Sequence, residues 1–189
     1  MLSLPAILFG LALALFTGLE IWVNVRDRGR VDASKDADSL RTIGRLRNAA
    51  FLIAIISTFF PVVPLPGGRG NLFLLGAALV LAGLFLRTWA VGKLGEYFTG
   101  VVMTHENQRL VTDGLYRYVR HPAYAGALLF FAGLATATGS LPGLCLIGTM
   151  MVYAFRKRIE VEEKVMISLF GQEYIDYMKR TKRVIPLLY

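Results

Sequence analysis

The sequence PAYAGALLFFAGLATATGSLPGLCLIGTMMVYAF, residues 122–155, consists of two apolar runs separated by a turn rich in glycine and proline. The first run extends from Pro122 to Thr138 and the second from Leu141 to Phe155, and neither contains a charged residue. Because glycine and proline mark turns, the stretch predicts a tight helical hairpin. Each arm is short for a bilayer span, so we expect the arms to lie in thinned bilayer or to continue as helix beyond it.

Three further apolar runs precede this hairpin: Leu2 to Val25, Ala49 to about Leu65, and Asn71 to Val91. A helix needs about 20 residues to cross a hydrocarbon layer of roughly 30 Å, whereas the strands of a barrel would alternate in polarity. The chain has 189 residues, of which 55% are hydrophobic, and its mean hydropathy is +0.53. One small soluble core cannot bury so much apolar surface. We therefore expect an all-α, polytopic membrane protein with about five transmembrane helices and a cytosolic C-terminal helical segment.

Basic residues are concentrated in three polar segments: a first loop that extends to Arg47, the connector 92–120, and the tail after Phe155. The other two loops contain only Arg69. Because Lys and Arg accumulate in cytosolic loops, we expect the N-terminus outside and the C-terminus in the cytosol, in a prokaryotic plasma membrane or the endoplasmic reticulum. We expect residues 1–91 to form a three-helix N-terminal membrane region. Residues 92–189 are then one unit of connector, hairpin and cytosolic helices.

The net charge of +8 does not indicate a nucleic-acid partner. The basic residues lie between apolar runs, and no soluble segment presents a basic face with interleaved aromatic residues. The single cysteine, Cys145, lies inside an apolar run, which excludes a disulfide framework and a cysteine-rich metal site. We expect no metal.

Two ionisable residues lie inside the predicted spans, Glu20 in the first and Arg87 in the third. Each is about one helical turn from the cytosolic boundary, so their equal depth makes them candidate partners. One interpretation is a structural ion pair or an arginine that extends to the interface. The other makes Arg87 the floor of an anion-binding cavity.

The densest group of polar residues, Leu110 to Tyr124, precedes and enters the fourth span. Pro122 suits the first turn of a helix, which would leave Arg120 and His121 at a helix N-terminus that favours an anion. The alternative is an interfacial anchor of arginine and tyrosine that contacts lipid headgroups.

A charged segment that we expect to be helical follows the fifth run. Its Arg158 and Glu162 are four residues apart, so they share one face, and this face is expected to meet Arg120 and His121. Glu160 and Glu163, each considered alone, fit a solvated charged helix better. The stretch from Phe170 to Pro186 is expected to form a helix end, a short amphipathic helix and a docked tail.

With these residues the sequence resembles the isoprenylcysteine carboxyl methyltransferase family and its phospholipid methyltransferase relatives. The resemblance covers roughly the C-terminal hundred residues, whereas the first two helices agree in hydropathy only. The matching positions are Leu110-Val111, Gly114, Tyr116, Arg120-His121-Pro122, Tyr124, Arg158, Glu162-Glu163, and Phe170-Gly171 through Tyr174 to Pro186.

The resemblance implies that S-adenosylmethionine binds in a pocket formed by cytosolic connectors, and the chain has no G-x-G-x-x-G after a strand. One departure concerns Gln108-Arg109, where many members have histidine before the Leu-Val pair. Arg158 would face the methyl acceptor, helped by Arg87, and Glu162 would hold the cationic cofactor. The cofactor contacts that the resemblance implies are Gln108, Arg109, Leu110, Val111, Tyr116, His121, Pro122, Ala123, Tyr124, Glu162 and the adjacent Glu163.

The implied function is methylation of the carboxylate of an isoprenylcysteine or a similar lipophilic acid. The substrate, a lipophilic small molecule or a prenylated chain, would enter from the bilayer among membrane lipids. A second interpretation is a phospholipid N-methyltransferase, whose amine acceptor would require a base such as Glu162, Glu163 or His121. A third is an NADPH-dependent reductase of the sterol type, and a fourth is a non-enzymatic membrane scaffold.

Overall fold

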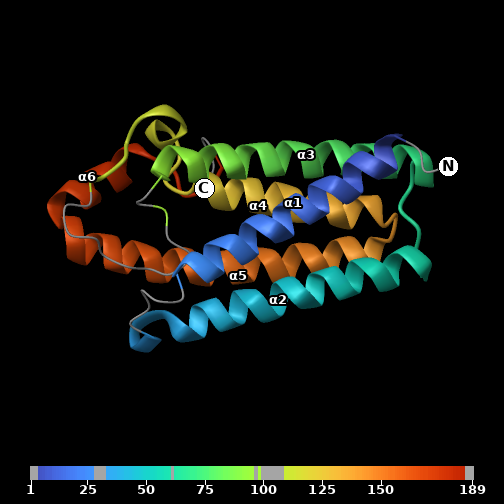
Figure 1. Cartoon of the computed structure of the whole chain (residues 1–189), viewed down its shortest axis with the longest axis horizontal. Helices are drawn as coiled ribbons and strands as arrows, with labels where there is room; N and C mark the ends of the chain where they lie inside the picture. The colour runs from blue at the N-terminus through green and yellow to red at the C-terminus, as the bar shows by residue number, and fades with distance from the viewer. Residues whose placement is uncertain (1–3, 28–32, 61, 96–97, 99–108, 186–189) are drawn as a thin grey trace.

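The computed structural model describes residues 4–27, 33–60, 62–95, 98 and 109–185, and these residues form helices joined by short turns (Figure 1). Within these residues there is no β-strand, only two isolated bridges, Pro64 with Ser140 and Val119 with Lys182. The helices are α1 (Leu4–Asp27), α2 (Ala33–Phe59), α3 (Arg69–Leu94), the 3₁₀ helix η2 (Gly114–Arg117), α4 (Pro122–Ala137), α5 (Leu141–Phe170) and α6 (Gln172–Arg180). The all-α class predicted from the sequence is therefore confirmed.

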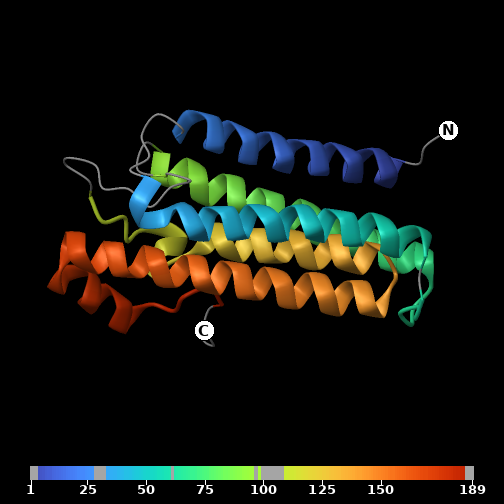
Figure 2. The ribbon, with the colours of Figure 1, turned by 90° about the horizontal axis from the view of Figure 1, so that it is seen from below.

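The five long helices form an elongated bundle in which α3 packs along α4, and α2 packs along α5 (Figures 1 and 2). Helix α1 crosses the bundle and contacts α3. The α4–α5 turn lies at one end, where Leu65 N donates to Gly139 O at 2.8 Å. The opposite end contains α6 and the segment that leads into α4. Residues near 120 and near 160, far apart in sequence, thus lie at the same end.

Close contact between α3 and α4 depends on glycine. A Cβ atom on Gly83 would lie 2.6 Å from the carbonyl oxygen of Gly126, and one on Gly126 would lie 2.6 Å from the backbone nitrogen of Arg87. Both distances are well below van der Waals contact, so neither position accepts a side chain without movement of the backbone. Small residues of this kind allow helix backbones to approach closely in membranes. The approach brings Arg87 directly against the first turns of α4.

The predicted hairpin is confirmed, with a turn at Gly139 (φ 67°) and a cap on α5 from Ser140, whose Oγ accepts from Gly143 N at 3.3 Å. Helix α5 does not end with the apolar run at Phe155 but continues to Phe170, so the charged segment after this run is helical, as predicted. The predicted first loop is wrong over much of its length. Helix α2 begins at Ala33, so the charged residues from Lys35 to Arg47 are helical.

The number of membrane spans stays a prediction. Within the described residues, α3 alone is long and apolar enough to cross a bilayer, and the apolar helical stretches Phe9–Val23 and Pro122–Ala137 are shorter. Helices α2 and α5 have sufficient length, but each is apolar in one half and charged in the other. Exposed apolar side chains such as Leu15, Leu52, Phe85 and Val152 cover the outward faces of α1, α2, α3 and α5.

Candidate functional site

The N-terminus of α4 is held by the C-terminal tail. His121 occupies the N-cap position and Pro122 the first turn, as predicted. Arg120 N donates to Lys182 O at 2.8 Å, and His121 N donates to Arg183 O at 2.9 Å. These bonds satisfy backbone groups at the helix entrance, so the tail is docked rather than free, in agreement with the sequence interpretation.

Glu163 connects this tail to α5. Its side chain is 4% exposed, and it accepts from Arg120 Nε at 3.0 Å and from Arg183 Nε at 3.0 Å. Burial raises the pKa of Glu163, but the imidazole of His121 and the guanidinium groups of Arg183 and Arg120 outweigh burial and lower the pKa to about 2. The expectation that Glu163 lies on a solvated face is therefore wrong. The anion at the entrance to α4 is a carboxylate of the chain itself.

His121 and Glu162 form a second, less complete contact beside Glu163. His121 Nδ1 lies 3.7 Å from Glu162 Oε2, and His121 Nε2 lies 3.5 Å from Glu163 Oε1. Among the described residues, His121 Nε2 and Glu162 Oε2 are buried and make no hydrogen bond. Buried polar atoms normally have partners, so the hydrogen-bonding capacity of these two atoms is left unused in this arrangement.

Tyr124 joins this pair to Arg158. The Tyr124 hydroxyl interacts with both the Glu162 carboxylate and the Arg158 guanidinium. Its ring lies between those of His121 and Phe155, with centroid distances of 5.6 Å and 5.4 Å. The predicted convergence of α5 with the mouth of α4 is thus confirmed at the level of side chains.

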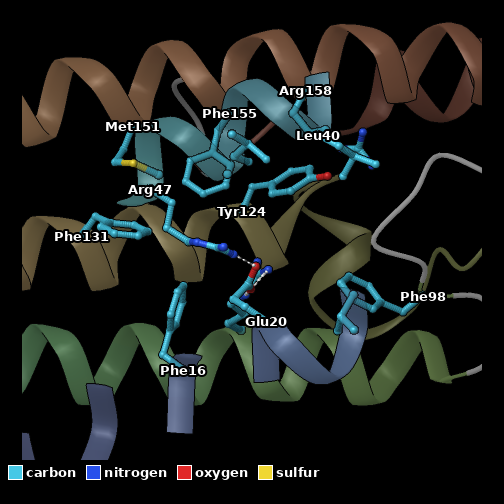
Figure 3. Close-up of a pocket in the computed structure, with 14 residues that line it drawn as sticks. Phe16, Glu20, Leu40, Arg47, Phe98, Tyr124, Phe131, Met151, Phe155 and Arg158 are labelled. Carbon is cyan, nitrogen blue, oxygen red and sulfur yellow. Dashed lines mark hydrogen bonds and ion pairs between the residues drawn. The ribbon is translucent and has the colours of Figure 1, made fainter. Parts of the chain in front are cut away.

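Tyr124 also lines a cavity whose empty volume is about 680 Å³ when the open solvent at its mouth is included (Figure 3). All five long helices contribute to its lining. The lining residues are Phe16, Glu20, Val23, Leu40, Ile43, Gly44, Arg47, Arg87, Phe98, Tyr124, Phe131, Met151, Phe155 and Arg158.

Glu20 and Arg87 form the ion pair predicted from their equal depth. Arg87 Nε donates to Glu20 Oε1 at 2.9 Å, Arg87 Nη2 also pairs with this oxygen, and Arg87 Nη1 donates to Ala123 O at 3.1 Å. Arg47 adds a longer contact of 3.4 Å to Glu20 Oε2 (Figure 3). Because the ion pair lines the cavity, the structure agrees with both interpretations of the sequence: a structural ion pair, and an anion-binding cavity with Arg87 at its floor.

Arg158 lies at the Tyr124 end of the cavity, where it is 3% exposed. Its Nη1 donates to Ser39 Oγ on α2 at 2.8 Å. Three arginines from three helices and one carboxylate therefore line one cavity, together with aromatic and aliphatic side chains. An amphiphilic molecule with an anionic group matches this composition.

The remaining predicted cofactor contacts are distributed around the N-terminal end of α4. Tyr116 is buried and its hydroxyl donates to Ala90 O at 3.2 Å, and Val111 packs against the same cluster. Pro122 and Ala123 are buried in the first turn of α4, Leu110 is half-buried, and Arg109 is exposed. Gln108 lies outside the described residues.

Sequence reasoning missed Ser39 and Arg47. Both belong to the charged half of α2, which was interpreted as a loop because of its alternating charges. The available signal was the helical spacing of Leu40, Ile43 and Arg47, which all line the cavity.

Comparison with known proteins gives a consistent set of relatives. A sequence model of a family described as phospholipid methyltransferase matches residues 72–173, more than half of the chain. Protein-S-isoprenylcysteine O-methyltransferase of Schizosaccharomyces pombe is 31% identical over 150 residues, which cover 78% of this chain and 58% of the yeast protein. Protein-S-isoprenylcysteine O-methyltransferase B of Arabidopsis thaliana is 27% identical over 160 residues, which cover 82% of this chain and 81% of the plant protein.

A solved structure also resembles the fold. It is that of a eukaryotic intramembrane Ras methyltransferase, an isoprenylcysteine carboxyl methyltransferase, and it superposes with a TM-score of 0.70 at 23% sequence identity. The match covers 94% of this chain and 64% of that one, so this chain spans less than two thirds of the length of that protein. At this identity the likeness establishes a shared helical arrangement.

Proposed function

Because the chain belongs to the phospholipid methyltransferase family, as its C-terminal motifs predicted, we propose that it is an integral membrane methyltransferase. It uses S-adenosylmethionine to O-methylate the carboxylate of an isoprenylcysteine or a similar lipophilic acid. The observation that carries the proposal is the placement of Arg47, Arg87 and Arg158 around one cavity, next to the incompletely satisfied His121 and Glu162.

Helices α1 to α5 cross the bilayer in this proposal, with the α6 end in the cytosol and the N-terminus outside. The outward apolar side chains of four of these helices support such a placement, since contiguous exposed apolar surface is unusual in a soluble monomer. The positive-inside rule supports the orientation, because α6 and the entrance to α4 lie at one end of the bundle (Figure 1).

The cofactor would lie beside His121 and Glu162 at that cytosolic end. S-adenosylmethionine supplies an electrophilic methyl group carried by a sulfonium. The Glu162 carboxylate complements the positive charge, and the two buried atoms without hydrogen bonds provide an acceptor and a ring nitrogen for polar groups. Glu163 already has two arginine partners, so in this proposal it positions the tail and Arg120 and does not contact the cofactor.

The acceptor would occupy the cavity that Tyr124 lines, where three arginines and one carboxylate leave excess positive charge among the described lining residues. A carboxylate is ionised at neutral pH and needs no general base. Arg158 and Arg87 would orient it, and the apolar walls would exclude water from the nucleophile. Methyl transfer is an in-line displacement that depends mainly on such alignment and desolvation.

A phospholipid amine fits this cavity less well. An amine must lose a proton before it attacks, and the carboxylate that lines the cavity, Glu20, is engaged by two arginines. The excess positive charge would also repel an ammonium group. The same three arginines therefore favour an acid over an amine as methyl acceptor.

The proposal is tested by titration of the full chain, purified in lipid nanodiscs, with S-adenosylhomocysteine and separately with NADPH. We expect S-adenosylhomocysteine to bind and NADPH not to. Glu162→Gln should weaken binding at least tenfold, since a hydrogen bond to a charged group contributes about 1.5–3 kcal/mol. Glu160→Gln is the matched control, because Glu160 lies on the same helix and pairs at the surface with Arg156. Binding of NADPH alone, or equal affinity in both variants, would overturn the proposal.

A further inference from the structure

The charged half of α2 forms one wall of the acceptor cavity. Leu40, Ile43, Gly44 and Arg47 follow helical spacing and all line the cavity, so one continuous face of α2 is turned toward it. This part of α2 precedes the segment matched by the family model, which begins at residue 72.

On α2, Gly44 lies between two residues that contact charged side chains of other helices. One helical turn after Gly44, Arg47 contacts Glu20 at 3.4 Å. About 1.4 helical turns before Gly44, Ser39 accepts from Arg158 at 2.8 Å. A ligand that extends between Arg158 and the Glu20–Arg47 contact therefore passes Gly44.

The backbone at Gly44 does not require a glycine. A Cβ atom built on Gly44 meets no other atom within 4 Å, whereas one on Gly83 would lie 2.6 Å from a carbonyl oxygen of α4. Glycine within a helix is destabilising relative to alanine or leucine. Helix packing therefore explains Gly83 but leaves Gly44 unexplained, while the space above Gly44 belongs to the cavity.

Building on the proposed function, we propose that Gly44 determines acceptor specificity by leaving room for a branched apolar chain beside the arginines. The occupant is an amphiphilic acid whose side branches, like the methyl groups of an isoprenoid, lie over the α2 backbone. The aromatic rings of Phe16 and Phe155 form walls of the same cavity and provide apolar contact for such a chain.

The test compares two acids that carry the same N-acetylcysteine carboxylate and have hydrocarbon main chains of equal length. These are N-acetyl-S-farnesylcysteine, which is branched, and N-acetyl-S-dodecylcysteine, which is not. Each is assayed with the full chain in nanodiscs, as a methyl acceptor or, where turnover is slow, as a competitive inhibitor. We expect Gly44→Leu to raise the KM or Ki of the branched acid at least tenfold and that of the unbranched acid no more than about threefold. Gly44→Ala should give an intermediate effect.

Two readouts and one control variant separate this role from a structural one. Gly44→Leu should leave S-adenosylhomocysteine affinity within twofold of the wild type and should not lower the Tm, because leucine favours helix more than glycine does. Gly148→Leu is the matched control, since a Cβ there also meets open space but Gly148 does not line the cavity.

Equal effects on the two acids, or no effect on either, would overturn the role of Gly44 while leaving the proposed function intact. A wild-type chain that methylates neither acid would overturn the proposed function, and the inference about Gly44 with it.

Discussion

Removing the carboxylate of Glu20 should destabilise the fold more than removing any surface carboxylate. The Arg87 and Glu20 side chains are 8% and 17% exposed, so both are largely withdrawn from water. Loss of one partner of a buried ion pair leaves an uncompensated charge and costs about 3–5 kcal/mol. Arg87 retains its bond to Ala123 O, which places the expected loss for Glu20→Ala at the lower end, about 3 kcal/mol.

The assay is equilibrium unfolding of the full chain in mild detergent, followed by fluorescence of its two tryptophans. Trp89 lies two residues after Arg87 on α3, so its emission reports on this part of the bundle. Glu160→Ala is the control, because the Arg156–Glu160 pair is exposed and such pairs contribute about 0–1 kcal/mol.

A double-variant cycle separates the ion pair from its surroundings. The cycle consists of Glu20→Leu, Arg87→Leu and the variant that carries both substitutions. Each single substitution leaves one uncompensated charge and the double variant leaves none, so the double variant should lose at least about 1 kcal/mol less stability than the sum of the two single losses. The assignment of Glu20 and Arg87 as a buried, coupled pair is wrong in either of two cases. In the first, Glu20→Ala lowers the free energy of unfolding no more than Glu160→Ala does. In the second, the effects of the two leucine substitutions on this free energy are additive.

Three further outcomes are expected. Arg158→Lys should lower kcat/KM for the acid about a hundredfold, with S-adenosylhomocysteine affinity unchanged in a binding titration, because lysine loses the planar guanidinium that holds a carboxylate through two bonds; a parallel loss of cofactor affinity would contradict this role. Glu163 has a depressed folded pKa of about 2, so its stabilising contribution is present above the unfolded pKa of about 4.3 and is lost as pH falls toward 2. Limited proteolysis of the tail should accordingly show no change between pH 8 and pH 5 and increasing cleavage below, a pH dependence that Glu163→Gln removes. Gly83→Ala should lower the free energy of unfolding by about 1–3 kcal/mol through overpacking of α3 on α4, whereas Gly148→Ala, in open space, should not lower it.

The parts of the fold that depend on local pattern were predictable. Uncharged apolar runs bounded by glycine and proline located the hairpin, and Pro122 marked the start of α4 because its ring suits a first helical turn. The Glu20–Arg87 pair followed from equal depth in two predicted spans. In each case the prediction needed only local information: the residues of one helix, or the depth of a residue below one membrane boundary.

The parts that failed depend on tertiary contacts. Five residues beyond Arg158, at about 100° per residue, Glu163 lies roughly 140° around the helix from it, so spacing on α5 alone does not place it at the site. Glu163 becomes buried because Arg120 and Arg183, from two distant segments, converge on it. The charged half of α2 was likewise assigned to a loop because its helix is stabilised by packing on α5 rather than by an apolar run.

The chemical bond that the transferred methyl group forms shows whether the arginine-lined cavity presents a carboxylate for methylation. The full chain in nanodiscs is incubated with a methyl-labelled donor and a lipophilic acid, and the extracted product is treated with base. We predict label released as methanol from a methyl ester, and loss of that label in Arg158→Ala. Label that survives base, as in a methylated amine, would contradict the carboxylate assignment.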